Sequence, residues 1–117
     1  MKPVELPEEL NEKIFEIIEI SRQSGKIKKG TNEVTKAIEK GIAKIVITAS
    51  DVTPPEVIMH LPLLGKEKNI PVVAVKSRQE LGASAGLTVP TSSVAITEAG
   101  NAAKQLDEIL KRIKQLE

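Results

Sequence analysis

The chain has 117 residues, no cysteine, a single phenylalanine as its only aromatic residue and a formal net charge of +1. This length fits one domain with its own core, and the lack of cysteine excludes disulfides, thiolate zinc sites and cysteine nucleophiles. A near-neutral chain is not a polycation, so any nucleic-acid binding must come from a local patch, and it cannot rely on aromatic stacking.

The N-terminal segment "MKPVELPEEL" is acidic and interrupted by Pro3 and Pro7. It contains no secretory apolar region, and no apolar run in the chain approaches the length of a membrane span. We therefore expect a cytoplasmic protein without a membrane partner.

A first helix is predicted from Pro7 to Gly25. Glu8 and Glu9 favour the positive end of the helix dipole, and four apolar residues recur at helical spacing: Leu10, Ile14, Ile17 and Ile18. Phe15 falls beside this stripe, which predicts packing at the edge of the core rather than base stacking.

Residues 26–29, "KIKK", predict a short edge strand. A second helix is expected to begin at Gly30 or Thr31 and to end at Gly41. Its buried face combines three residues at positions i, i+3 and i+4: Val34, Ala37 and Ile38.

Two apolar runs, 43–49 and 70–75, predict buried strands. Between them, Pro54 and Pro55 predict the start of a helix that is broken or kinked near Pro62.

Ser77 and Glu80 form a capping box, which predicts a short helix through Ala85. Gly86 ends it, and a loop leads to a strand over 93–97. The last helix is expected to bury Ala103, Leu106, Ile109, Leu110 and Ile113. Helices that alternate with buried strands predict an α/β fold, a three-layer α/β/α sandwich around a mixed sheet of about four strands, with residues 1–117 in one domain.

Catalytic patterns are absent from the sequence. The single histidine, His60, lies in an apolar helical stretch, where a packed or capping role is commoner than that of a base. Asp51 follows a buried strand, where α/β folds place ligand groups, so a small-molecule site centred on Asp51 is one alternative. A polar residue that merely ends the strand is the simpler interpretation. We predict no enzyme, no catalytic residue, no metal ligand and no cofactor.

A basic segment precedes the second helix. Lys26, Lys28 and Lys29 lie just before a helix N-terminus, whose free N–H groups and dipole favour an anion such as phosphate. A short basic run can also be a solvated strand edge, and the residues alone leave both interpretations open.

Three polar residues of the second helix, Asn32, Glu33 and Lys36, point away from its apolar face and form one exposed cluster. A carboxylate accepts from N–H groups, an amide does both, and an ammonium donates to O6 or N7 acceptors. A guanine displays both kinds of group. The cluster therefore suits a base edge better than plain phosphate, which Glu33 would repel.

The sequence resembles the L7Ae family of kink-turn-binding ribosomal proteins, within the wider L30e-like group. The resemblance runs in order through "GKIKKGTNEVTKAIEKG", "DVTPPEVIMHLPLL", "KNIPVVAVKSRQELG", "AGLTVP" and "SVAI". The form of these motifs is most similar to the archaeal branch.

The resemblance implies RNA binding without catalysis. Members of this family bind the kink-turn, a sharply bent RNA element with tandem sheared G·A pairs and a flipped-out bulge nucleotide. Implied RNA partners are ribosomal RNA of the large subunit, box C/D and H/ACA guide RNAs and RNase P RNA. Implied protein partners are those of the ribosome and the guide particles, and no DNA is implied. The free protein is expected to be a monomer.

The resemblance also implies an RNA-binding site. Gly30, Thr31, Asn32, Glu33 and Lys36 match the motif that meets the G·A guanines and adjacent phosphates. Lys29 and Arg78 match basic positions at the RNA backbone. The bulge nucleotide would meet the loop of Leu87, Thr88 and Val89, together with Thr53.

The chain departs from the family pattern at several positions. Ser50 replaces an acid, Gly65 replaces a common cysteine, and Thr53 stands where an acid commonly contacts the flipped base. An altered preference at the bulge is the expected consequence. An alternative function is a protein-interaction scaffold that has lost RNA binding and docks a partner through His60, Pro62, Leu63 and Leu64.

Overall fold

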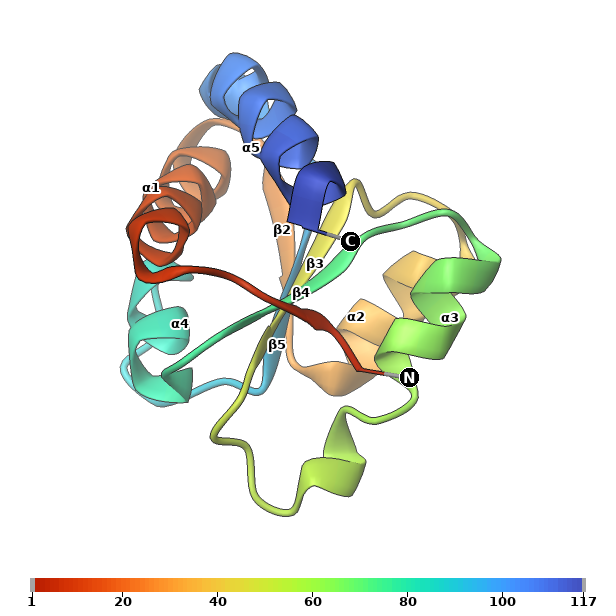
Figure 1. Ribbon diagram of the computed structural model, residues 1–117. Helices are drawn as coiled ribbons and strands as arrows, with labels where there is room; N and C mark the ends of the chain where they lie inside the picture. Colours follow the sequence, from red (N-terminus) through yellow and green to blue (C-terminus); the bar gives the residue numbers. More distant parts are fainter. Residues whose placement is uncertain (1, 117) are drawn as a thin grey trace.

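The computed structural model describes residues 2–116, which form a three-layer α/β/α sandwich (Figure 1). The central sheet has five strands in the order β1-β4-β3-β5-β2. The strands are β1 (Val4–Glu5), β2 (Lys26–Lys29), β3 (Ile45–Ala49), β4 (Val72–Val75) and β5 (Ser93–Glu98).

Two layers of helices cover the sheet. Figure 1 shows α1, α4 and α5 on one face and α2 with α3 on the other. The α-helices are α1 (Glu8–Ser24), α2 (Thr31–Glu39), α3 (Leu61–Glu67), α4 (Arg78–Ser84) and α5 (Ala103–Leu116), and the two 3₁₀ turns are η1 (Pro55–Val57) and η2 (Gly100–Ala102). None of the helices in residues 2–116 is long and apolar enough to cross a membrane.

Successive side chains along the buried strands point alternately into two hydrophobic clusters, because neighbouring residues of a strand face opposite sides of the sheet. Ile45 and Ile47 pack into the larger cluster beneath α1, α4 and α5, whereas Val46 packs into the smaller one beneath α2 and α3. In α1, the predicted apolar stripe is buried, and Phe15 packs at the edge of the larger cluster. A sheet buried on both faces explains why β3 reads as a continuous apolar run.

The predicted mixed sheet is confirmed, with one strand more than the predicted number. The additional strand, β1, pairs in parallel with β4 through Val4 and Val73. This strand lies between Pro3 and Pro7 and has only two residues, too few to give an alternating pattern.

The prediction for residues 54–69 was partly wrong. The segment is not one helix broken at Pro62; the 3₁₀ turn η1 comes first, and α3 then begins at Leu61 with Pro62 in its first turn. Proline is favoured there because the first N–H groups of a helix need no intrahelical partner. His60 consequently lies just before α3 and is exposed.

The prediction that the last helix buries Ala103 was also wrong. Ala103 is exposed and Ala102 is fully buried in its place, because η2 precedes α5 and changes the orientation of the first residues. From Leu106 onward the predicted buried stripe is confirmed, with Leu110 half-buried at its edge.

Candidate nucleic-acid interface

Four connections meet at one end of the sheet. Strand β2 ends there at Lys29 opposite Val94 of β5, and β3 and β4 end together where Ala49 faces Val75. The turn into α2, the segment after β3, the start of α4 and the loop before β5 therefore lie at this same end. Every residue that the sequence predicted for the RNA site belongs to one of these segments or to the first turns of α2.

Hydrogen bonds join these segments in series. The Gly30 N–H donates to the carbonyl of Ser93 at 2.9 Å, which connects the α2 turn to the first residue of β5, directly after the loop that precedes this strand. The Thr91 N–H of that loop donates to the Arg78 carbonyl at 3.2 Å. The Arg78 N–H in turn donates to the Asp51 carboxylate at 2.8 Å, which adds the segment after β3.

The α2 turn depends on Gly30. This residue has φ 87° and ψ 152°, a combination that is almost restricted to glycine. It lets the chain leave β2 and enter α2 with Asn32 and Glu33 facing solvent. The Glu33 carboxylate lies 3.8 Å from the Lys36 ammonium, and both side chains are more than half exposed. The predicted exposed cluster on this helix face is therefore present.

Two threonines of α2 hold the segment after β3. The Thr31 hydroxyl donates to the Val57 carbonyl at 3.0 Å. The Thr35 hydroxyl has one hydrogen, which it donates to the Thr31 carbonyl at 2.6 Å. The 2.8 Å contact between Thr35 Oγ1 and His60 Nε2 then requires the imidazole to be the donor. His60 is thus a structural donor at the surface, in a role that differs from the packed or capping role expected from sequence.

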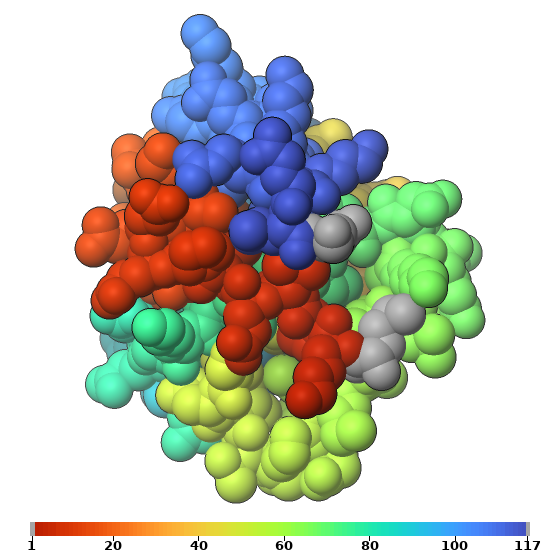
Figure 2. Space-filling view, in the orientation of Figure 1, coloured from red at the N-terminus to blue at the C-terminus, as the bar shows by residue number. Residues whose placement is uncertain are grey.

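The segment that these threonines hold protrudes at the surface. Figure 2 shows residues around 51–60 projecting at the bottom of the molecule, beside α4. Thr53 lies on this segment and is exposed. No sequence signal indicated the contacts of Thr31 and Thr35, because their partners lie 26 and 25 positions further along the chain.

Asp51 has a structural role in this arrangement. Its carboxylate accepts from the Arg78 N–H, while Ser77 Oγ accepts from the Glu80 N–H at 3.1 Å. Two side chains thereby satisfy free N–H groups at the start of α4, and the predicted cap by Ser77 is confirmed. The acid after β3 therefore has a structural role that does not depend on a ligand.

The loop from Gly86 to Pro90 contains the apolar residues that were predicted to contact the bulge nucleotide. Val89 is 60% exposed, whereas Leu87 is half-buried, so the apolar surface here is smaller than expected. The loop lies directly on α4, because a Cβ on Gly82 would collide with the carbonyl oxygen of Val89. Gly82 therefore determines how closely the loop approaches the helix.

Basic side chains surround the site. Lys28 and Lys29 are exposed at the end of β2, and Arg78 is exposed at the start of α4. Acids occur in the same segments, since Glu33 is exposed in the first turn of α2 and the Asp51 carboxylate accepts from the Arg78 N–H. A surface with both signs of charge is less suited to indiscriminate phosphate binding than a purely basic one.

The apolar patch that the scaffold alternative requires is only partly present. Of its predicted residues, Leu63 is 55% exposed, Pro62 is buried and Leu64 is half-buried. Pro62 and Leu64 pack inward because they belong to the inner side of α3. Met59, which the sequence had not singled out, is 62% exposed nearby in sequence.

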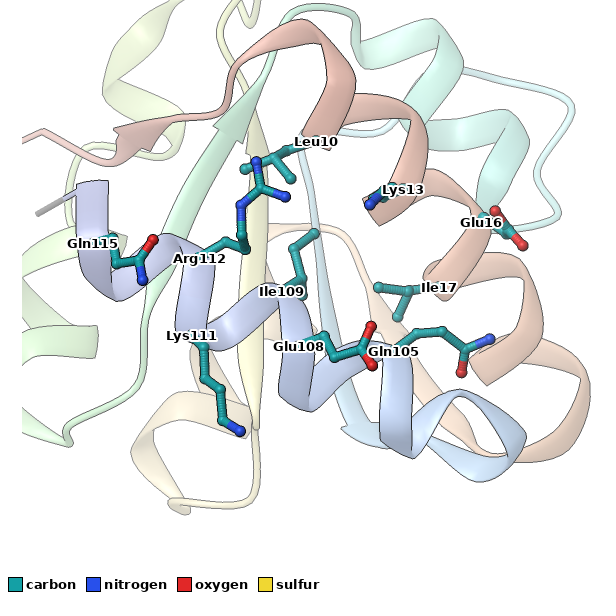
Figure 3. A pocket seen from close by; sticks show the side chains of 10 residues that line it. All are labelled: Leu10, Lys13, Glu16, Ile17, Gln105, Glu108, Ile109, Lys111, Arg112 and Gln115. Carbon is teal, nitrogen blue, oxygen red and sulfur yellow. The ribbon is translucent and has the colours of Figure 1, made fainter.

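Two hollows lie away from these segments, and the larger, of about 580 Å³, is lined by residues that include Val4, Pro62 and Ile113. A groove of about 440 Å³ separates α1 from α5, with Leu10, Ile17 and Ile109 at its floor and long polar side chains at its rim (Figure 3). None of the residues predicted for the RNA site lines it. Within residues 2–116 there is also no cluster of three or more potential metal ligands.

Comparison with known proteins provides independent information. Residues 12–106 match the model of the ribosomal protein L7Ae/L30e/S12e/Gadd45 family. Among solved structures, the chain is similar to a 15.5 kDa RNA-binding protein of Giardia lamblia, with 32% sequence identity and a TM-score of 0.88. That similarity covers 96% of this chain and 93% of the other.

Proposed function

Because the chain belongs to the ribosomal protein L7Ae/L30e/S12e/Gadd45 family, we propose that it is an RNA-binding protein that recognises and stabilises kink-turns. The observation that carries this proposal is the gathering of four connections at one end of the sheet, with an amide, a carboxylate and an ammonium exposed on the adjoining helix. The Giardia lamblia relative, described as RNA-binding, supports the RNA-binding part of this proposal.

The α2 cluster would read the sheared G·A pairs. In a sheared pair, the N1–H and O6 groups of guanine are not used for pairing. Glu33 would accept from N1–H, and Asn32 and Lys36 would donate to acceptors nearby. The Glu33–Lys36 pair is exposed, so separating its members for these contacts costs little.

The surrounding segments would bind the RNA backbone and the flipped-out bulge nucleotide. Lys29 and Arg78 supply cations for phosphates, and the backbone of Gly30 and Thr31 lies at the N-terminus of α2, where anions are favoured. The flipped nucleotide would pack on the loop of Leu87, Thr88 and Val89, since an unstacked base is stabilised by an apolar surface. Thr53, with a hydroxyl in place of the acid common in relatives, would give a different contact to that base.

The RNAs that we propose are ribosomal RNA of the large subunit, box C/D and H/ACA guide RNAs and RNase P RNA. The protein would act by binding alone, as a cytoplasmic monomer when free, and would join ribosomal and guide-particle proteins on the RNA. Recognition would depend on the bent shape of the RNA and on a few bases, because the chain offers no aromatic platform for single strands.

The test is a titration of the protein against two RNAs at fixed, moderate salt. One is a short kink-turn RNA, and the other is the same RNA with both sheared G·A pairs replaced by Watson–Crick pairs. We expect tight binding to the first and a collapse of binding on the second. Equal, weak binding to both would contradict the proposal.

The second candidate function is a protein-interaction scaffold of the same fold. Met59 and Leu63, both more than half exposed, favour it as the apolar part of a docking surface. Equal, weak RNA binding would support this function, whereas salt-sensitive binding that depends on the G·A pairs would reject it.

A further inference from the structure

Arg22, near the end of α1, lies against the loop that we propose for the bulge nucleotide. A Cβ placed on Gly86 would lie 2.7 Å from Cδ of Arg22, 2.9 Å from its Nε and 3.1 Å from its Cζ. The outer half of the arginine side chain therefore covers the open side of Gly86, the residue immediately before Leu87. Gly86 has φ 82°, a backbone conformation that glycine adopts without strain, and its lack of a side chain provides the space that Arg22 occupies.

The charge of Arg22 is available at this position. Arg22 is an exposed residue, and the ion pairs found among residues 2–116 join Lys26 to Glu98, Lys36 to Glu33 and Arg112 to Glu9. Arg22 belongs to none of them. Its planar group, held beside the loop by contact with Gly86, is suited to two parallel hydrogen bonds to a phosphate.

A nucleotide base on the loop brings its own phosphates to the same place. Leu87 and Val89 can contact only the base, because apolar side chains offer nothing to a phosphate. The cations predicted from sequence lie near the other end of the loop, because the Arg78 carbonyl accepts from the Thr91 N–H and Lys29 pairs with Val94. At the Gly86 end of the loop, Arg22 is the cation whose side chain lies against the backbone.

We propose that Arg22 is a further RNA-binding residue that contacts a backbone phosphate beside the flipped nucleotide. This inference rests on the proposed kink-turn binding and extends the site from the end of the sheet onto α1. The alternative is that Arg22 has only a structural role. It lies in the last turn of α1, where a cation stabilises the helix dipole. The two roles differ in what salt does to RNA binding.

The test compares wild-type protein with Arg22→Gln, Arg22→Lys and Lys13→Gln. Lys13 is the matched control, since it is an exposed cation of the same helix that lines the α1–α5 groove instead (Figure 3). Dissociation constants for the kink-turn RNA are measured from 50 to 300 mM salt, roughly a range in which counterion release dominates, and melting temperatures are measured in parallel.

We expect Arg22→Gln to make the dependence of the logarithm of the association constant on the logarithm of the salt concentration less steep by about one unit. Binding should weaken about eightfold near 0.1 M salt, as the loss of one phosphate contact predicts. Arg22→Lys should retain the slope, and Lys13→Gln should change neither quantity.

An unchanged slope in Arg22→Gln, with or without a lower melting temperature, would overturn the inference. It would leave the proposed function intact, provided that the wild-type protein binds. If the wild-type protein does not bind the kink-turn RNA, both the function and the inference are rejected.

Discussion

The ammonium of Lys36 lies 3.8 Å from the carboxylate of Glu33, one turn away on α2. Their side chains are 63% and 54% exposed, and an exposed pair of this kind contributes about 0 to 1 kcal/mol to stability. The two groups hold each other in place without burying their hydrogen-bonding capacity. A guanine that offers both a donor and an acceptor can therefore replace the pair at small cost.

Replacing Glu33 by alanine tests base reading. We expect Glu33→Ala to reduce affinity for the kink-turn RNA by about 1 to 3 kcal/mol and to relax the preference for sheared G·A pairs, because the N1–H of guanine loses its acceptor. Fluorescence anisotropy with both RNAs measures the effect. Glu39→Ala, which removes an exposed acid from the last turn of α2, is the control and should leave affinity unchanged. An equal loss on both RNAs would count against base reading.

Replacing Lys29 should have a different signature. Lys29 is exposed at the end of β2, beside the N-terminus of α2, where we propose that it contacts phosphate and no base. Lys29→Ala is expected to weaken binding to every RNA by a similar factor and to lower the salt slope by roughly one unit. A titration series in salt measures both quantities. A selective loss for the G·A-containing RNA would show that Lys29 reads sequence instead.

Gly30 should be intolerant of substitution although the space around it is empty. No heavy atom lies within 4 Å of a Cβ built there, so a steric clash with neighbours is not the reason. The reason is the backbone, because φ 87° with ψ 152° lies in a region that is essentially open to glycine alone. We expect Gly30→Ala to lower the free energy of unfolding by about 1 to 3 kcal/mol. Chemical denaturation measures this, and a neutral effect would mean that the turn rearranges freely.

Replacing Asp51 by alanine distinguishes a structural role of this residue from a role in a ligand site. Asp51→Ala removes the acceptor for the Arg78 N–H, and we expect the free energy of unfolding to fall by about 0.5 to 2 kcal/mol, as for other lost helix caps. Glu56→Ala, on the same segment, should have little effect. The small-molecule alternative would instead require a ligand that raises the melting temperature of the wild-type protein in a concentration-dependent way and fails to do so in Asp51→Ala.

Features of the fold that depend on periodicity could be predicted from sequence. The stripe of Ile14 and Ile18 and the continuous apolar run of β3 follow from burial on one or two faces, and both are present in the structure. The two-residue β1 could not be predicted, because Val4 and Glu5 pair with β4 through backbone groups alone and their side chains show no pattern.

The candidate site likewise has some features that could be predicted from sequence and others that could not. The exposed face of Asn32, Glu33 and Lys36 follows from helix geometry, and the roles assigned to these residues stay predictions. The contacts that place the neighbouring loops were not predictable, since Thr31 meets Val57 and Arg22 meets Gly86 across long separations in sequence. Pro62 shows how a local rule can mislead, because the same residue type that breaks a helix also begins one.

Gly82 provides a test of how the loop position affects binding. Alanine is a better helix former than glycine by about 1 kcal/mol, so Gly82→Ala would stabilise α4 if it were isolated. In the folded protein the new methyl group would collide with the carbonyl oxygen of Val89 and would lie 3.1 Å from Cα of Pro90. We therefore expect the loop to be displaced, with a net destabilisation of about 1 to 3 kcal/mol, typical of overpacking.

The matched control for Gly82→Ala is Ala83→Gly, at the next position of α4. Ala83 is exposed, and its replacement costs about 0.5 to 1 kcal/mol through helix propensity without touching the loop. If the loop holds the bulge nucleotide, Gly82→Ala weakens kink-turn binding far more than Ala83→Gly does. For an RNA whose bulge nucleotide has been replaced by an abasic linker, Gly82→Ala and the wild-type protein should have nearly the same affinity. Equal RNA affinities for the two variants would separate the loop from RNA recognition, because only one of them moves Val89.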